Sequence, residues 1–223
     1  MLNHRTGQMN NLFVDGKHRN QVICVAGRGE TVDFSVLMVD SLPNFHTISS
    51  GQAFPLYVYE ERSDQRDADL FGQRNQEQDI AKDGITDEGL KHFTDAYNGE
   101  SLSKEDLFYY IYGLLHSEEY KTRYADNLSK ELPRIPAVKK FDDFMAFSVA
   151  GRKLADLHLN YETVEPYAVN IEGGALLLST FTDSDYYVTQ MKFASKTDKS
   201  TVIYNHKITM HNIPVEALSL IHI

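Results

Sequence analysis

Short apolar runs separated by polar turn residues make up much of the first sixty positions, a pattern typical of β-strands. The run Gln21–Ala26 is rich in β-branched residues, and a second run follows at Asp33–Val39. The glycine-rich segment Gly27-Arg28-Gly29 lies between them, so the two runs predict a β-hairpin. Phe54–Tyr59 predicts a third strand. Pro55 has no backbone N–H and therefore places that strand at a sheet edge or at a strand start.

Further along the chain, apolar residues recur at three- and four-residue steps, which predicts a block of helices. Residues 60–84 lack this periodicity and are interpreted as a polar connection. Thr86, Ser103 and Ser117 are the expected N-caps of the first three helices, because each hydroxyl precedes an acidic first turn. Pro133 ends the third of these helices.

The longest predicted helix covers roughly residues 139–158. It follows the segment Leu132–Pro136, which is expected to be extended because each proline disfavours helix in the residue before it. Gly151 inside the helix costs about 1 kcal/mol relative to alanine. We therefore expect another segment to pack closely against Gly151.

The C-terminal part returns to a β-like pattern. Residues 175–178, 186–193 and 201–204 predict strands, and residues 196–200 form the expected hairpin loop between the last two. The order of elements predicts an α+β fold, with β-rich N- and C-terminal parts around a central block of three to four helices.

Charge and composition restrict the functions to be considered. The chain of 223 residues carries a net charge of −10, and residues 60–106 alone account for −8. Most free nucleic-acid-binding domains are basic, so composition alone argues against DNA binding. The single cysteine, Cys24, excludes an internal disulfide. With no signal peptide and no apolar run of membrane-spanning length, the expected location is the cytoplasm.

The sequence contains no recognisable catalytic motif. A phosphate-binding Gly-x-x-x-x-Gly-Lys-Ser/Thr loop is missing, as is the Asn-Pro-Pro-Tyr tetrapeptide of adenine methyltransferases. The nine histidines are not spaced as metal ligands. Ala26–Gly29 could suggest a nucleotide loop, but a strand-like run follows it and a hairpin turn is the better interpretation. We therefore expect no cofactor and no metal in this chain.

A resemblance to a known family changes this interpretation. Phe108–Ser117, Leu128–Pro136, Ala150–Glu162 and Val188–Phe193 occur in the same order as similar segments of the C-terminal specificity domain of Type ISP restriction–modification enzymes. Together with shorter matches, the resemblance spans roughly residues 20–217.

The resemblance implies a role in sequence-specific recognition of double-stranded DNA. Type ISP enzymes are single polypeptides that carry a nuclease, a helicase-type ATPase, an adenine-N6 methyltransferase and then a target-recognition domain. The missing motifs would then lie upstream in the same polypeptide, and the parent enzyme would use S-adenosylmethionine, ATP and Mg²⁺. Whether this chain by itself belongs to an enzyme stays open.

The resemblance also suggests that residues 1–217 are a recognition domain that is incomplete at both ends. Residues 218–223 depart from the family and coincide with the translation of a sequencing-library transposon adapter. We expect these six residues to be an artefact, the alternative being a genuine apolar terminal strand.

DNA contact would require cations for phosphates and polar side chains for base edges. The candidates lie where the charge of the chain turns positive: Arg134, Lys139, Lys140, Arg152, Lys192, Lys196, Lys199, Asn205 and Lys207. Lys153, next to Arg152, belongs to the same basic stretch. The alternative is a protein-interaction module that uses the tyrosine-rich helical block as its docking face and does not bind DNA.

Overall fold

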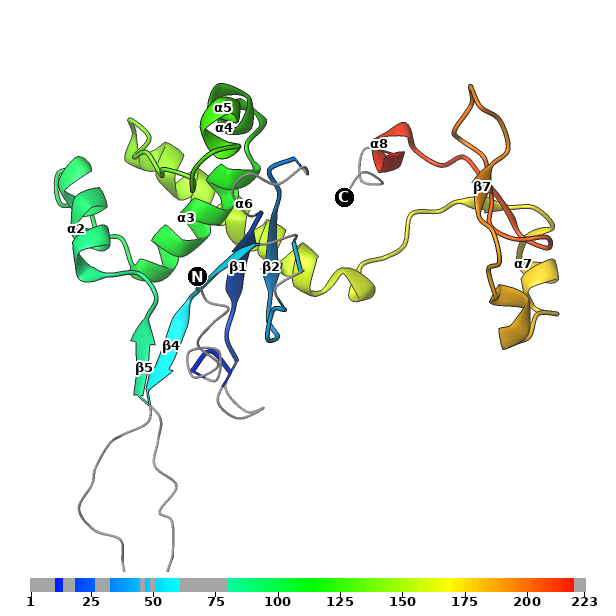
Figure 1. Cartoon of the computed structure of the whole chain (residues 1–223), viewed down its shortest axis with the longest axis horizontal. Coiled ribbons are helices and arrows are strands. Elements are labelled where there is room, and N and C mark those ends of the chain that lie inside the picture. The colour runs from blue at the N-terminus through cyan, green and yellow to red at the C-terminus, as the bar shows by residue number, and fades with distance from the viewer. Residues whose placement is uncertain are drawn as a thin grey trace, which may run out of the picture. The chain divides into compact units, whose positions relative to one another are not determined.

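The chain forms two compact units, Met1–Val164 and Glu165–Ile223, in a computed structural model (Figure 1). The structure describes residues 11–13, 19–26, 33–44, 47–48, 51–60 and 80–218. The predicted turn at 27–29 and residues 219–223 lie outside this range. Each unit is described separately below.

A three-stranded antiparallel sheet forms the β part of the first unit. Its strands are β1 (Val22–Val25), β2 (Val36–Val39) and β3 (Gln52–Pro55), in the order β2-β1-β3. All four residues of β1 are buried, which explains the continuous apolar run in the central strand. The predicted pairing of the first two runs is confirmed, and Pro55 ends an edge strand as expected.

The predicted strand 54–59 is in fact two strands that belong to different sheets. The chain bends at Leu56, and β4 (Tyr57–Glu60) pairs with β5 (Ile80–Asp83). Buried Asn20 stabilises the bend, because its amide accepts from the Tyr57 N–H at 3.1 Å and donates to the Tyr57 carbonyl at 2.7 Å. The interpretation of residues 60–84 as a connection was therefore wrong for β5, which has no alternating pattern of its own.

The helical block agrees with the capping pattern of the sequence. It consists of α2 (Asp87–Ala96), α3 (Lys104–His116), α4 (Glu118–Arg123), α5 (Ala125–Leu128) and α6 (Phe141–Leu159). The hydroxyls of Thr86, Ser103 and Ser117 accept backbone N–H bonds at the starts of α2, α3 and α4. The predicted third helix is interrupted at Tyr124 and is therefore divided into α4 and α5.

Helix α3 lies at the centre of the first unit. Its tyrosines Tyr109, Tyr110 and Tyr112 are buried, and the helix packs along α6 and against β2. The buried apolar side chains of α3 lie on nearly all sides of the helix, as expected for a helix inside a core. The hydroxyl group of each of these tyrosines forms a hydrogen bond. For example, the Tyr109 hydroxyl donates to the Gln21 side chain at 2.6 Å, and the Tyr112 hydroxyl accepts from the Met38 N–H at 3.0 Å.

The second unit contains short elements and one small sheet. Its elements are β6 (Asn170–Ile171), α7 (Gly174–Leu178), a 3-10 turn η3 (Asp183–Tyr186), β7 (Lys192–Phe193), β8 (Val202–Ile203), β9 (Thr209–His211) and α8 (Val215–Leu218). The antiparallel order is β6-β9-β8-β7. The predicted hairpin loop 196–200 connects β7 to β8, as expected.

Two strand predictions in this unit were wrong. Residues 175–178 belong to helix α7, which begins at Gly174; its N-cap Gly173 and Gly174 itself have positive φ angles of 84° and 59°. A short apolar run does not distinguish a strand from a helix, and Leu176 at its centre is 86% exposed. Of the predicted strand 186–193, only Lys192 and Phe193 pair, because the chain first completes the η3 turn. The α+β class is confirmed.

Candidate nucleic-acid interface

The candidate contact residues fall into both units. Arg134, Lys139 and Lys140 belong to the extended connection between α5 and α6. Two buried tyrosines hold this connection: Tyr120 donates its hydroxyl to the Arg134 carbonyl at 2.7 Å, and Tyr110 donates to the Pro136 carbonyl at 2.5 Å. Burial raises the pKa of Tyr120 to about 12, so its hydroxyl stays a donor at neutral pH. The backbone under these cations is thus supported from the core.

The three side chains on this connection differ in their freedom to bind phosphate. Arg134 donates to the Glu131 carboxylate at 3.0 Å, and both groups face solvent. Lys139 and Lys140 are exposed and pair with no acidic residue that the structure describes. Lys140 is the N-cap residue of α6, and Asp142 in the first turn places a negative charge nearby. Phosphate contact at this point would therefore be partly opposed.

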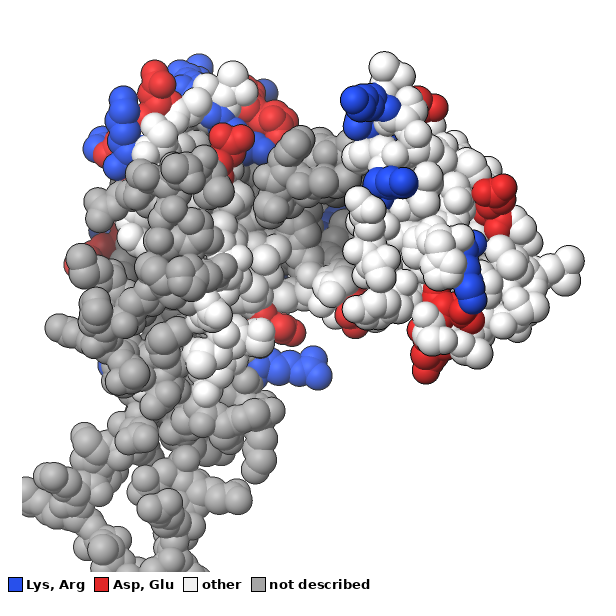
Figure 2. Space-filling model, turned by 45° about the vertical axis from the view of Figure 1, so that its right-hand side comes forward, with Lys and Arg blue, Asp and Glu red and all other residues white. Residues whose placement is uncertain are grey.

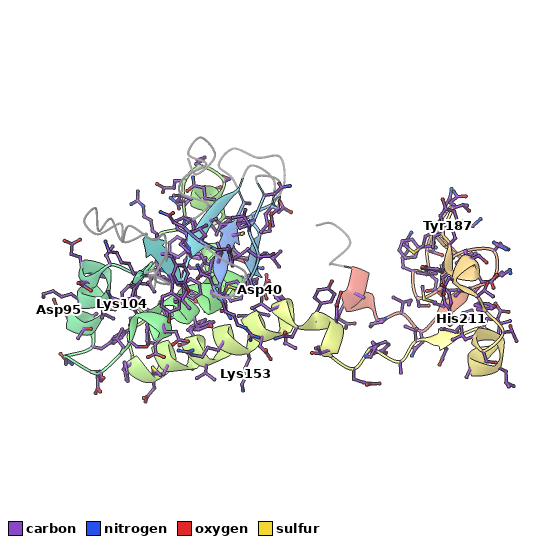
Figure 3. All side chains as sticks on the ribbon, turned by 90° about the horizontal axis from the view of Figure 1, so that it is seen from below. Asp40, Asp95, Lys104, Lys153, Tyr187 and His211 are labelled. Carbon is purple, nitrogen blue, oxygen red and sulfur yellow. The ribbon has the colours of Figure 1, made fainter. Side chains whose placement is uncertain are left out.

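Arg152 is already bound within the first unit. Its guanidinium donates to the Glu105 carboxylate at 2.7 Å and to the Asp106 carboxylate at 2.9 Å, and it lies 4.3 Å from the centre of the Tyr109 ring. These contacts connect α6 to the first turn of α3. The structure thus places Arg152 in an intramolecular ion pair rather than on a free surface. Lys153 points away from the sheet side of α6 (Figure 3).

The β7–β8 hairpin of the second unit presents three lysines, Lys192, Lys196 and Lys199, and one aspartate, Asp198. Lys192 and Lys196 are exposed and make no ion pair with a described residue. Lys199 lies over the Phe193 ring, with its ammonium 4.2 Å from the ring centre. In Figure 2, the blue side chains along the upper edge of this unit are surrounded mainly by white surface.

Local hydrogen bonds order the hairpin loop. The Ser195 hydroxyl accepts from the backbone N–H groups of Thr197 and Asp198, and the Asp198 carboxylate accepts from the Ser200 N–H at 2.8 Å. The bond from Ser200 lowers the pKa of Asp198. Such side-chain turns hold a loop in one conformation. The lysines therefore project from a pre-organised loop.

Asn205 and Lys207 have structural partners in the second unit. Asn205 is 4% exposed, and its amide donates to the carbonyls of Asp185 and Tyr187 while accepting from the N–H groups of Lys207 and Ile208. Lys207 pairs with the Asp185 carboxylate, an interaction that lowers the pKa of Asp185 to about 2. Neither side chain is free to read a base edge in this arrangement.

Comparison with known proteins identifies the family. The sequence model of the Type ISP C-terminal specificity domain matches residues 1–219. The chain belongs to this family. A search of curated proteins found no match.

Solved structures agree with this assignment of the specificity domain, and two of them, LlaBIII and LlaGI, are Type ISP restriction–modification enzymes. The enzyme LlaBIII bound to DNA is 30% identical over 97% of the chain, with a TM-score of 0.74. A nuclease-deletion mutant of LlaGI with a DNA substrate mimic is 31% identical over 95%, with a TM-score of 0.67. The DrdV–DNA complex is 28% identical over 93%, with a TM-score of 0.72. The specificity domain spans only 13%, 16% and 19% of these chains, respectively.

The tyrosine-rich block of this specificity domain is not available as a docking face. The rings of Tyr109, Tyr110, Tyr112 and Tyr120 are all buried in the core of the first unit. The surface that the protein-interaction alternative requires is therefore missing from the described part of the chain. Within that same part, no group of acidic, histidine or cysteine side chains is arranged to hold a metal, and no helix is long and apolar enough to cross a membrane.

Sequence reasoning overlooked one exposed feature of the specificity domain. Tyr187 is 73% exposed and Met191 is 61% exposed, and both lie in the predicted strand 186–193. A local signal was present: Thr182 and Asp185 have capping-box spacing, and they do form a capping box at η3. That spacing indicates a helical turn just before Tyr187 rather than a strand through it.

Proposed function

We propose that this chain recognises a specific sequence in double-stranded DNA for a Type ISP restriction–modification enzyme. The proposal rests on the extent of the match along the chain. The specificity-domain model covers residues 1–219, and three related proteins solved with DNA or a DNA mimic align over at least 93% of the chain.

The β7–β8 hairpin is the part of the described surface best suited to bind phosphate. Lys192 and Lys196 are exposed and unpaired among the described residues; Lys192 lies on strand β7, and Lys196 lies in the ordered loop that follows it. Lys139 and Lys140 would add contacts from the first unit. Phosphate contacts of this kind set position and register on a duplex, while base-edge contacts provide specificity.

The negative net charge is compatible with this role because the acid is concentrated outside these segments. Residues 60–106 contribute −8 of the total of −10. With this net negative charge, the chain alone should bind duplex DNA weakly and with a strong dependence on salt. The remaining phosphate contacts would come from other parts of the parent polypeptide.

The parent polypeptide would provide the chemistry that this chain lacks. The proposal places nuclease, helicase-type ATPase and adenine-N6 methyltransferase parts upstream, as partners of the specificity domain. S-adenosylmethionine, ATP and Mg²⁺ would be bound by those parts. Target recognition by this chain would then select the adenine to be methylated and the site where the motor starts.

A direct test measures binding of the 223-residue chain to a duplex pool of randomised sequence at several salt concentrations. We expect weak binding whose logarithm falls linearly with log[salt], and enrichment of one asymmetric sequence after repeated selection. The double variant K192Q/K196Q should bind more weakly and reduce the salt slope by about two.

The control is K91Q/K130Q, which also removes two exposed lysines but from the helical block, where Lys91 pairs with Asp95 at 2.6 Å. It should leave the slope nearly unchanged. The proposal is wrong if the wild-type chain shows no binding at low salt. It is also wrong if repeated selection enriches no sequence.

A further inference from the structure

The backbone around Tyr187 is held by side chains from the β8–β9 segment. Three successive carbonyls, those of Asp185, Tyr186 and Tyr187, accept hydrogen bonds from this segment. Tyr204 donates to the Tyr186 carbonyl at 3.2 Å, and buried Asn205 donates to the other two at 2.8 and 3.3 Å. A further bond joins the Tyr187 N–H to the Ser184 carbonyl at 3.3 Å.

The Tyr187 side chain has no comparable support. Its ring is 73% exposed, and it makes no hydrogen bond or ring contact with any residue that the structure describes (Figure 3). The neighbouring Tyr186 differs, because its ring packs edge-on against Phe181 with centroids 5.8 Å apart. Tyr187 thus combines a constrained backbone with a free aromatic ring.

Such an arrangement favours contact with a partner. A tyrosine side chain offers a large, rigid contact surface with few rotatable bonds, and a constrained backbone lowers the entropy lost on binding. The Tyr187 ring is not part of the core of the second unit, whose only buried residues in the described part of the chain are Asn205 and Ile208.

The charges nearby select the kind of partner. The acidic group closest in sequence, Asp185, pairs with Lys207. Exposed Asp183 lies four residues before Tyr187, and Lys192, a cation that pairs with no described acid, lies five residues after it. An exposed aromatic ring a few residues from an unpaired lysine is complementary to duplex DNA, which offers phosphates together with apolar thymine methyl groups at the base edges of the major groove. An acidic protein surface would match the lysine but offers no comparable set of base edges.

We propose that Tyr187 is a pre-organised aromatic contact that packs against a base edge of the bound duplex DNA, and that Asn205 is the residue that positions it. This inference rests on the proposed function, since it names one contact of the same interface. Asn205 was expected to contact a base edge directly; in this proposal it instead holds the backbone that carries Tyr187.

Tryptophan fluorescence provides a direct test, because the chain contains no tryptophan. The Y187W variant therefore has a single reporter at the proposed contact, and Y167W is the matched control, since Tyr167 is also exposed in the second unit. On adding the randomised duplex pool, the emission of Y187W should be quenched, while that of Y167W should change much less.

Affinity gives an independent readout. Y187A should weaken duplex binding about tenfold or more, as expected for loss of a base–aromatic contact. Y187F keeps the ring and should bind nearly as tightly as the wild-type chain. Circular dichroism of Y187A should match that of the wild type, because the ring is largely exposed and makes no hydrogen bond or ring–ring contact with a described residue.

The outcomes separate this inference from the proposed function. If the wild-type chain binds but Y187A binds equally well and Y187W is not quenched, the inference is wrong and DNA recognition stands. Equal quenching of Y187W and Y167W would also overturn a localised contact. Blue-shifted emission of Y187W without DNA would place the ring in a protein interface instead. If the wild-type chain does not bind, both fail.

Discussion

Gly151 on α6 lies directly against Gly113 on α3. A Cβ atom built on Gly151 would lie 2.9 Å from the Gly113 backbone nitrogen and still closer to the Tyr109 carbonyl oxygen. The two helices therefore approach each other closely enough that only glycine fits at the crossing. This confirms the close packing expected from a glycine inside a predicted helix.

We expect G151A to destabilise the first unit, although alanine is the better helix former by about 1 kcal/mol. The methyl group would force the two backbones apart, and overpacking of this kind costs about 1–3 kcal/mol. Urea unfolding followed by circular dichroism measures the change in unfolding free energy. G89A is the control, because a Cβ at Gly89 would meet only side-chain atoms of Thr86 and Ile85, at 3.3 Å or more. A G151A variant as stable as wild type would contradict the close crossing.

The Tyr112 hydroxyl joins α3 to the sheet and to α6. It accepts from the Met38 N–H at 3.0 Å and forms a hydrogen bond with His158 Nδ1. We expect Y112F to lower the free energy of unfolding by about 1–3 kcal/mol, because a buried N–H would lose its acceptor. Amide exchange at Met38 should become faster. Y161F, at an exposed tyrosine whose hydroxyl bonds only to Glu162, should be neutral.

Two histidines predict how the stability of the first unit depends on pH. The rings of His116 and His158 meet edge to face with centroids 5.4 Å apart. Burial lowers the pKa of both, and that of His116 falls to about 4, with a further contribution from the neighbouring His158. Both imidazoles are therefore neutral in the folded chain at neutral pH.

Because the unfolded chain binds these protons near pH 6.5 and the folded chain does so only at lower pH, acid favours unfolding. The stabilisation is fully present above pH 6.5 and is lost as the pH falls towards about 4. We expect a loss of about 1–2 kcal/mol after allowing for partial exposure of the rings. Urea unfolding between these pH values measures the loss. The H116L variant should show a shallower pH dependence; an unchanged slope would show that His116 is not responsible.

Asn205 predicts a local effect in the second unit. In N205D, a carboxylate oxygen would replace the amide donor that faces the carbonyls of Asp185 and Tyr187. We expect faster amide exchange across residues 182–187, with no change in β1–β3. N212D is the matched control, since Asn212 is exposed and its positive φ of 61° suits aspartate as well. Equal protection in N205D and wild type would rule out the positioning role.

The sequence by itself determined the elements whose signals are local. Thr86, Ser103 and Ser117 begin helices because a hydroxyl can satisfy nearby N–H groups without any distant partner. The buried run of β1 and the close contact at Gly151 could also be predicted, since both follow from composition over a few residues.

Only the tertiary structure decided which polar side chains are free. Arg152 and Asn205 were both predicted to contact DNA. In the structure, Arg152 is bound by the carboxylates of Glu105 and Asp106. The Asn205 side chain forms hydrogen bonds with four backbone groups. The strands of the second unit have two or three residues each, so cross-strand partners and not periodicity define them. Partners distant in sequence leave no local pattern, which is why only the folded chain shows that Arg152 and Asn205 are already bound.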